Sequence, residues 1–218
     1  MEAERIGKIL FRARSYTPIP FIVLAILFSN AGPISTIVGL MLIIAGEFMR
    51  IWSVGYAGAR TRATSLGAAR DLVTAGPYAH TRNPIYIGNI LIAFGFSVMS
   101  NIRFLMLLSA IWFPLQYWLI VRAEEEYLLK EFGWRYERYT QNVPRFLFRA
   151  TPYLYRSNHD FSLRRALRSE RQTLIGIILL IVLKRDDHSR ALISRPEADA
   201  LDRRREITRP ADIDRMTG

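Results

Sequence analysis

Long stretches without a charged side chain dominate the first half of this chain. No charge occurs between Arg14 and Glu47, between Arg82 and Arg103, or between Arg103 and Arg122. A helix needs about 20 mostly apolar residues to cross a bilayer, whereas a buried helix of a soluble protein usually keeps a polar stripe. These stretches have no such stripe. The pattern therefore predicts an all-α integral membrane helical bundle.

Turn-forming residues divide the first apolar region into a helical hairpin. Residues 30–33 read Asn-Ala-Gly-Pro, and Pro33 suits the first turn of the following helix. The leg before this turn, residues 17–29, is short for a membrane span. We therefore expect the first helix to begin earlier, near Ile6, with Arg12 and Arg14 reaching back to the membrane interface.

The remaining apolar segments complete the predicted bundle. Residues 33–52 would extend about 30 Å at 1.5 Å per residue, which suits one crossing. A second hairpin is expected over residues 85–121, with its turn at residues 100–101, so that four crossings result. The apolar run 174–183 is too short to cross unaided. It is either an interfacial or bundle-packed helix, or a fifth span that borrows residues 166–173.

The expected domain organisation follows from this count of four to five transmembrane helices in two hairpins. Residues 1–150 form the transmembrane domain, and residues 151–183 form a basic linker with the short apolar helix. Residues 184–218 are rich in both charge signs and poor in large apolar side chains, so we expect a poorly ordered tail.

The basic residues indicate the orientation of the bundle. The formal net charge is +11 in a chain that is 50% hydrophobic. Lys and Arg gather in the N-terminal arm, in the loop between the hairpins and after Val121, whereas the two opposite turns contain only Arg103. Basic loops stay cytoplasmic. We expect an inner or plasma membrane location, a cytoplasmic N-terminus, and contacts with anionic lipid headgroups rather than nucleic acid. The sequence does not indicate an oligomeric state.

Two polar stretches on the expected cytoplasmic face are candidates for chemistry. Residues 73–88 contain Gly-Pro and Asn-Pro bends together with Tyr78 and Tyr86, which is also typical of an interfacial aromatic belt. Residues 122–126 read Arg-Ala-Glu-Glu-Glu where the last long helix leaves the bilayer. Adjacent carboxylates repel one another and need cationic partners; Arg122 and Glu126, four residues apart, are spaced to pair. The alternative is a solvated helix end with a surface ion pair.

Other enzyme signatures are missing. The chain has no cysteine and three scattered histidines, so no metal site is expected. No Gly-rich nucleotide-binding motif or paired-histidine zinc motif occurs.

Taken together, the two polar stretches resemble the isoprenylcysteine carboxyl methyltransferase family, which is related to phospholipid methyltransferases. The resemblance covers about residues 70–146. Its motifs, in order, are Gly-Pro-Tyr at 76–78, Arg-Asn-Pro-x-Tyr-x-Gly at 82–88, a membrane hairpin, Arg-x-Glu-Glu at 122–125, Phe-Gly-x-x-Tyr-x-x-Tyr at 132–139 and Val-Pro-Arg at 143–145.

The resemblance implies an integral membrane methyltransferase that uses S-adenosyl-L-methionine in a cytoplasmic pocket and takes a lipophilic substrate from the bilayer. Arg122 would orient the acceptor and Glu125 would be the candidate base. The family normally has His where this chain has Asn83, and Asn cannot transfer a proton. The implied cofactor-binding residues are Leu72, Val73, Tyr78, Asn83, Pro84, Tyr86 and Glu124.

The acceptor and even the activity stay open at this stage. Protein carboxyl O-methylation is the leading expectation, and phospholipid N-methylation or small-thiol S-methylation are the alternatives. A non-enzymatic membrane protein that retains the fold, or a reductase using a nicotinamide cofactor on a related fold, would also fit the pattern.

Overall fold

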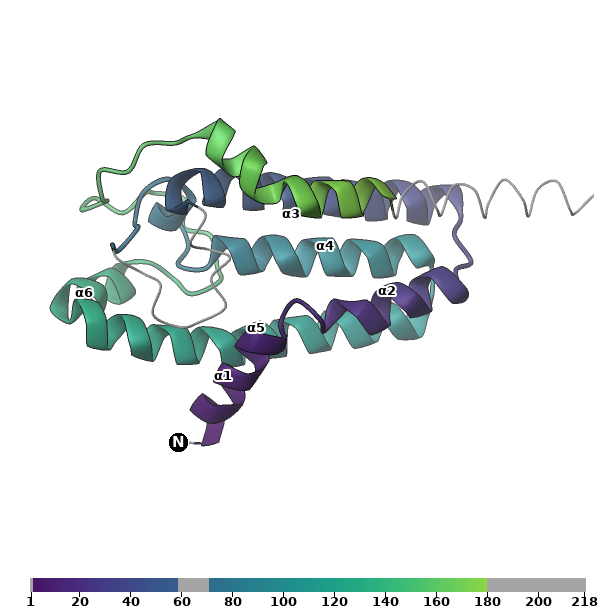
Figure 1. The fold of residues 1–218 in the computed structure, drawn as a ribbon, viewed down its shortest axis with the longest axis horizontal. Helices are drawn as coiled ribbons and strands as arrows, with labels where there is room; N and C mark the ends of the chain where they lie inside the picture. The colour runs from purple at the N-terminus through teal and green to yellow at the C-terminus, as the bar shows by residue number, and fades with distance from the viewer. Residues whose placement is uncertain (1, 59–70, 180–218) are drawn as a thin grey trace, which may run out of the picture. The chain divides into compact units, whose positions relative to one another are not determined.

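The computed structural model describes residues 2–58 and 71–179, and it is helical in both ranges without any strand. Residues 163–179 are also helical. The all-α prediction is thus confirmed. The other helices in these ranges are α1 (Glu2–Ala13), α2 (Pro18–Leu27), α3 (Pro33–Ala57), the 3₁₀ helix η2 (Gly76–Ala79), α4 (Pro84–Ser100), α5 (Arg103–Phe132) and α6 (Trp134–Asn142), as Figure 1 shows.

The chain divides into two compact units, Met1–Arg171 and Gln172–Gly218. All helices from α1 to α6 lie in the first unit. The expected tail 184–218 lies outside the described residues, as does the end of the 174–183 run. Both expectations therefore stay predictions.

Two helices, α3 and α5, are long and apolar enough to cross a membrane. A third span results if α1 and α2 are counted as one helix pair, bent by 50°. Helix α4 has 17 residues, or about 26 Å, which is at the lower limit of a crossing. The structure therefore gives two or three spans plus a short apolar helix where four crossings were expected.

The turns of the two hairpins lie at the same end of the bundle. The Asn30 backbone N–H donates to the Ser100 carbonyl at 3.0 Å, and the Asn101 side chain donates to the Asn30 carbonyl at 3.0 Å. Asn101 takes a left-handed conformation with φ of 57°, which suits an Asn in a tight turn. Both turn predictions are confirmed, and Pro33 begins α3 as expected.

Helices α3 and α4 pack as an antiparallel pair with their backbones in close contact. A Cβ atom on Gly39 would lie 2.6 Å from the Gly95 carbonyl oxygen, and one on Gly46 would lie 2.7 Å from the Gly88 carbonyl oxygen. Small residues are what permits such an approach between membrane helices. This contact fixes the start of α4, and with it the position of the candidate site.

Large apolar side chains cover the outer faces of α2, α3 and α5. Leu27, Ile34, Met41, Phe104 and Leu107 are all more than half exposed. Exposed apolar surface on this scale is unfavourable in water and favourable against lipid tails. The first unit therefore has the surface of a membrane helical bundle.

Candidate functional site

The end of the bundle opposite the hairpin turns carries the polar motifs, and we call it the loop end. It consists of residues 71–83, the start of α4 and the residues after Val121. Gly76 opens η2 with φ of +59°, and a Cβ there would come within 2.3 Å of the Tyr56 ring. Only glycine satisfies both constraints. Pro77 and Pro84 are buried, so the chain between them is held firmly against the bundle.

Tyr86 and Glu124 meet at the loop end from two different helices. The Tyr86 hydroxyl donates to Glu124 Oε1 at 2.9 Å. Tyr86 is buried and stacks on Tyr117 with ring centroids 4.9 Å apart, so the phenol is fixed. Glu124 is only half-buried, and no ion pair involves it in the described ranges. This half-buried carboxyl group thus lies beside a fixed aromatic ring.

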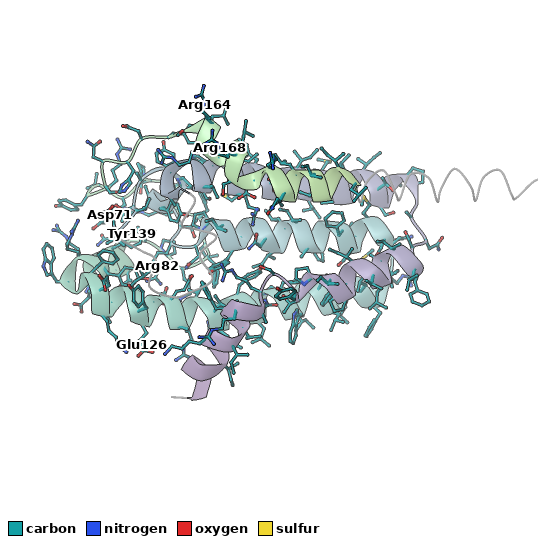
Figure 2. All side chains as sticks on the ribbon, in the orientation of Figure 1. Asp71, Arg82, Glu126, Tyr139, Arg164 and Arg168 are labelled. Carbon is teal, nitrogen blue, oxygen red and sulfur yellow. The ribbon has the colours of Figure 1, made fainter. Side chains whose placement is uncertain are left out.

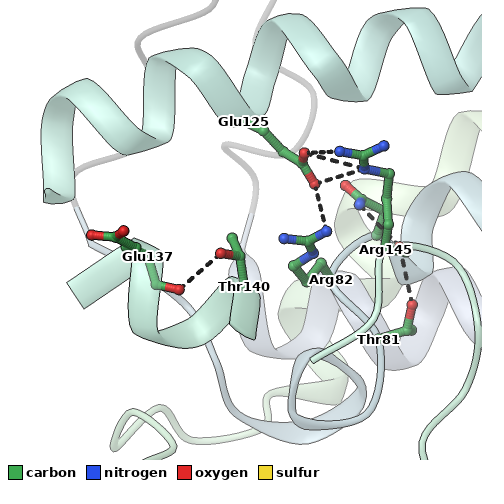
Figure 3. A network of polar contacts seen from close by, with 7 residues as sticks. Thr81, Arg82, Glu125, Glu137, Thr140 and Arg145 are labelled. Carbon is green, nitrogen blue, oxygen red and sulfur yellow. Dashed lines mark hydrogen bonds and ion pairs between the residues drawn. The ribbon is translucent and has the colours of Figure 1, made fainter. Parts of the chain in front are cut away.

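Glu125, by contrast, is held by two arginines (Figure 3). Arg145 Nε lies 3.0 and 3.1 Å from its two oxygens, Arg145 Nη2 lies 2.5 Å from Oε2, and Arg82 Nη2 lies 3.2 Å from Oε1. The hydrogen bonds to Glu125 raise the pKa of Arg145. A carboxylate with both oxygens bonded to guanidinium groups is a poor proton acceptor. We call this arrangement the Glu125 clasp.

The clasp joins two segments that also share backbone contacts. The Arg82 N–H donates to the Pro144 carbonyl at 3.0 Å. The carbonyl of Arg145 accepts hydrogen bonds from Thr81 Oγ1 at 3.3 Å and Asn83 Nδ2 at 3.1 Å. Residues 143–146, which we call the roof segment, therefore lie against the 81–83 turn. Asn83 serves here as a neutral donor, a role that needs no titratable group.

A cluster of buried tyrosines packs against η2 and donates a hydrogen bond to it. The Tyr139 hydroxyl donates to the Tyr78 carbonyl at 2.6 Å, and Tyr139 packs with Tyr136 and Tyr153. Leu72 packs against the same cluster. Burial raises the pKa of Tyr78, with a further contribution from the Glu124 charge, and burial likewise raises the pKa values of Tyr136 and Tyr139. These phenols remain neutral hydrogen-bond donors at neutral pH.

The structure brings some of the predicted site residues together and separates others. Tyr86 and Glu124 are in contact, and the Glu124 charge acts on Tyr78. Arg122 is exposed, and its guanidinium lies 4.9 Å from the centre of the Trp118 ring, so it is not brought to this pair. Val73 is half-buried in the chain that leads into η2.

The local pairing expected for Glu126 is wrong. Glu126 pairs with Lys130 at 2.6 Å rather than with Arg122. Figure 2 shows Glu126 on the side of α5 that points away from Arg82 and Tyr139. Glu126 is thus the solvated surface carboxylate of the three, and only its two neighbours face the loop end.

The sequence profile described as phospholipid methyltransferase matches residues 34–135, which include η2, α4 and nearly all of α5. The Tyr86–Glu124 pair lies within the matched segment. Residues 34–135 belong to the phospholipid methyltransferase family. It is the family of isoprenylcysteine carboxyl methyltransferase-like membrane methyltransferases, so the resemblance found in the motifs is confirmed.

Two curated proteins are similar to this chain. The cobalt-zinc-cadmium resistance protein CzcN of Cupriavidus metallidurans is 25% identical over 142 residues, which are 62% of each chain. The nickel-cobalt-cadmium resistance protein NccN of Alcaligenes xylosoxydans xylosoxydans is 27% identical over 124 residues, 57% of this chain and 54% of that protein. The matches thus span less than two thirds of the relatives' lengths. No solved structure is significantly similar.

Sequence reasoning missed a second polar cluster, which joins α3 and α4 to Glu170. Arg50 on α3 donates to the Asn89 side chain on α4 and pairs with Glu170 at 2.5 Å. Its Nε also lies 3.5 Å from Glu47. Glu170 is fully buried. Since Arg50 and Glu170 are 120 positions apart, no local spacing rule indicates this pair.

His80 contacts the backbone and an aromatic ring of the segment after α6. Its Nδ1 lies 2.8 Å from the Arg149 carbonyl, and its ring stacks on Phe148 with centroids 4.9 Å apart. Within 2–58 and 71–179 no three His, Asp or Glu side chains are grouped as metal ligands would be. The loop end is therefore a site of aromatic rings, carboxylates and guanidinium groups.

Proposed function

We propose that the protein is an S-adenosyl-L-methionine-dependent membrane methyltransferase that methylates a lipophilic acceptor at the cytoplasmic face. The family supplies the coarse assignment, a membrane methyltransferase. The observation that carries the finer one is the Tyr86–Glu124 pair, in which a half-buried carboxyl group lies beside a fixed aromatic ring. Within the family, isoprenylcysteine-type O-methylation is our first candidate, and the profile description favours phospholipid N-methylation as the second.

The residues present fit the proposed cofactor. Glu124 offers a carboxylate for an ammonium group, and the faces of Tyr78 and Tyr86 suit a sulfonium cation. Both phenols stay neutral, so neither tyrosine competes with Glu124 for the cationic groups of the cofactor. Asn83 and Pro84 would shape the site through the roof segment and the start of α4, and Leu72 and Val73 would line its approach. S-adenosylmethionine would supply there an electrophilic methyl group on a sulfur that leaves as a neutral thioether.

The chain itself has mainly to align the acceptor and keep water out. The Glu125 clasp holds the roof segment over the 81–83 turn, which encloses the site. We therefore propose Glu125 as a positioning residue rather than the base. A carboxylate acceptor has no proton to lose, so the chemistry needs none; an amine or thiol acceptor would have to release its proton to water or to Glu124.

We propose no direct metal site in this chain, although the two relatives are named for metal resistance. The described residues contain no group of metal-ligating side chains, and the chain has no cysteine.

Calorimetric titration of the purified full-length protein in detergent with S-adenosylmethionine tests the proposal. Glu124→Gln keeps the shape and removes the charge, so we expect affinity to fall about tenfold or more, because a hydrogen bond to a charged group contributes about 1.5–3 kcal/mol. Tyr86→Phe should weaken binding less. Glu126→Gln, with its surface partner Lys130, is the matched control and should bind normally. Equal affinity of Glu124→Gln and the wild type would show that the site is assigned wrongly.

A further inference from the structure

The guanidinium of Arg50 on α3 joins α4 to the helix that begins at residue 163. It donates to the Asn89 side chain on α4, and it pairs with Glu170 at 2.5 Å. The side chain of Arg50 is 13% exposed, and that of Glu170 is fully buried. Charged side chains inside an apolar helix such as α3 are costly and generally mark a function, so this arginine calls for an explanation.

Gly88 makes room for Arg50 at the start of α4. A Cβ on Gly88 would lie 2.7 Å from Arg50 Cγ, so the stem of the arginine crosses α4 at this glycine. Its guanidinium then reaches Asn89, the next residue along the helix. Asn89 follows Tyr86 by three residues, and residues three apart are neighbours on one helix face. Arg50 therefore holds the part of α4 that carries Tyr86.

Asn89 also connects α4 with α5. It forms a side-chain hydrogen bond with Tyr117, on which the Arg50 charge also acts. Tyr117 is 3% exposed, and its ring stacks on that of Tyr86 with centroids 4.9 Å apart. The Tyr86 hydroxyl in turn donates to Glu124 at 2.9 Å. A continuous series of contacts therefore leads from Arg50 to the carboxyl group that we propose for the cofactor.

Glu170 comes from a helix outside the segment 34–135 that matches the family profile. The chain is bonded to α3 where it enters this helix, since the Ser162 N–H donates to the Gly55 carbonyl at 3.1 Å. Ala166 and Glu170, four residues apart and hence on one helix face, are both fully buried. Glu170 is therefore a fixed partner for the arginine rather than a surface carboxylate.

We propose that Arg50 and Glu170 are positioning residues for the cofactor site. Glu170 holds the Arg50 guanidinium, which fixes Asn89 and the start of α4. The two stacked tyrosine rings beside Glu124 then keep their arrangement. Both residues act through α4 rather than by contact with the cofactor, so the site depends on a carboxylate outside the family segment. The inference rests on the proposed function for the word cofactor, but the ring arrangement can be measured without a ligand.

Calorimetric titration of the full-length protein in detergent with S-adenosylhomocysteine tests the inference. Asn89→Leu keeps the branched shape and removes the polar groups, whereas Arg50→Lys keeps the charge but loses the planar fork that reaches two partners. We expect each to weaken binding about three- to tenfold, and the double variant to weaken it no more than the stronger single one, because both break the same series of contacts. Glu170→Gln should also weaken binding. Ser97→Ala, which removes a buried hydroxyl bonded within α4, is the control and should bind normally.

A measurement without ligand separates positioning from a loss of stability. Tyrosine labelled with carbon-13 at the ring carbon that bears the hydroxyl gives one NMR signal per residue, and Tyr86→Phe and Tyr117→Phe assign the two signals of interest. Both signals should shift in Arg50→Lys and in Asn89→Leu, at a temperature where thermal denaturation shows the variants to be folded. Asn89→Leu decides alone if Arg50→Lys does not fold.

The inference would be overturned by unchanged tyrosine signals in the folded variants, or by normal affinity in Asn89→Leu. Effects of Arg50→Lys and Asn89→Leu that multiply in the double variant would also overturn it, because Arg50 would then not act through Asn89. A wild type that binds no cofactor, while the variants still shift both tyrosine signals, would refute the proposed function and leave the series of contacts intact.

Discussion

Replacing Arg145 by glutamine should loosen the roof segment without unfolding the bundle. The substitution removes three contacts of 2.5–3.1 Å to Glu125 and leaves Arg82 at 3.2 Å, so Glu125 keeps one cationic partner. Hydrogen bonds to charged groups contribute about 1.5–3 kcal/mol. Because the Arg145 side chain is 33% exposed, solvent screening reduces this, and we expect about 1–2 kcal/mol. The ratio of protein with the roof segment closed to protein with it open should therefore fall about five- to thirtyfold.

Hydrogen exchange at the Arg82 amide measures this opening directly, because that N–H donates to the Pro144 carbonyl of the roof segment. We expect its exchange in Arg145→Gln to accelerate by about five- to thirtyfold. Cofactor affinity should fall by no more than this factor, because only the fraction of closed protein changes. Lys130→Gln, which removes an exposed ion pair, is the control. Unchanged exchange at Arg82 in Arg145→Gln would refute the role of the Glu125 clasp.

Two further predictions concern the bundle and the tyrosine cluster. Gly95→Val places atoms into the α3 backbone and should lower the free energy of unfolding by about 1–3 kcal/mol or more, as measured by thermal denaturation. Gly32→Ala should change it little, because a Cβ there would meet only Ser35 Oγ, at 4.0 Å. Equal effects of the two substitutions would contradict the close helix contact. Burial raises the pKa values of Tyr136 and Tyr139, so their contribution to stability is intact below the unfolded pKa of about 10 and is lost as pH rises further. Absorbance titration should show them ionising at a higher pH than free tyrosine, and ionisation at the pH of free tyrosine would count against their burial.

Local signals predicted the outline of the fold well. The turns at Asn30 and Asn101 and the start of α3 at Pro33 each depend on residues within one turn of the chain, and all three agree with the structure. The break after Ala13 was not predicted, because Pro18 also suits a simple helix start. Nothing local distinguishes a helix that begins at a proline from one that is bent just before it.

The candidate site was predicted as a set of motifs but not as a set of contacts. The spacing rule for helices favoured Arg122 with Glu126, whereas Glu126 pairs with Lys130. Glu125 finds its partners 43 positions before and 20 positions after it, on segments that only the folded chain brings together. The arginines that hold Glu125 are distant in the sequence, so sequence spacing could not show which of the three adjacent carboxylates they bind.

The central claim is that Glu124, beside Tyr86, holds the cofactor of a methyl transfer to a lipophilic acceptor. Its most direct test is to incubate membranes containing the wild type or a variant with methyl-labelled S-adenosylmethionine and to measure label that extracts into organic solvent. We predict incorporation by the wild type and by Glu126→Gln, and a loss of about tenfold or more in Glu124→Gln. No incorporation by the wild type, or equal incorporation by Glu124→Gln, would contradict the claim.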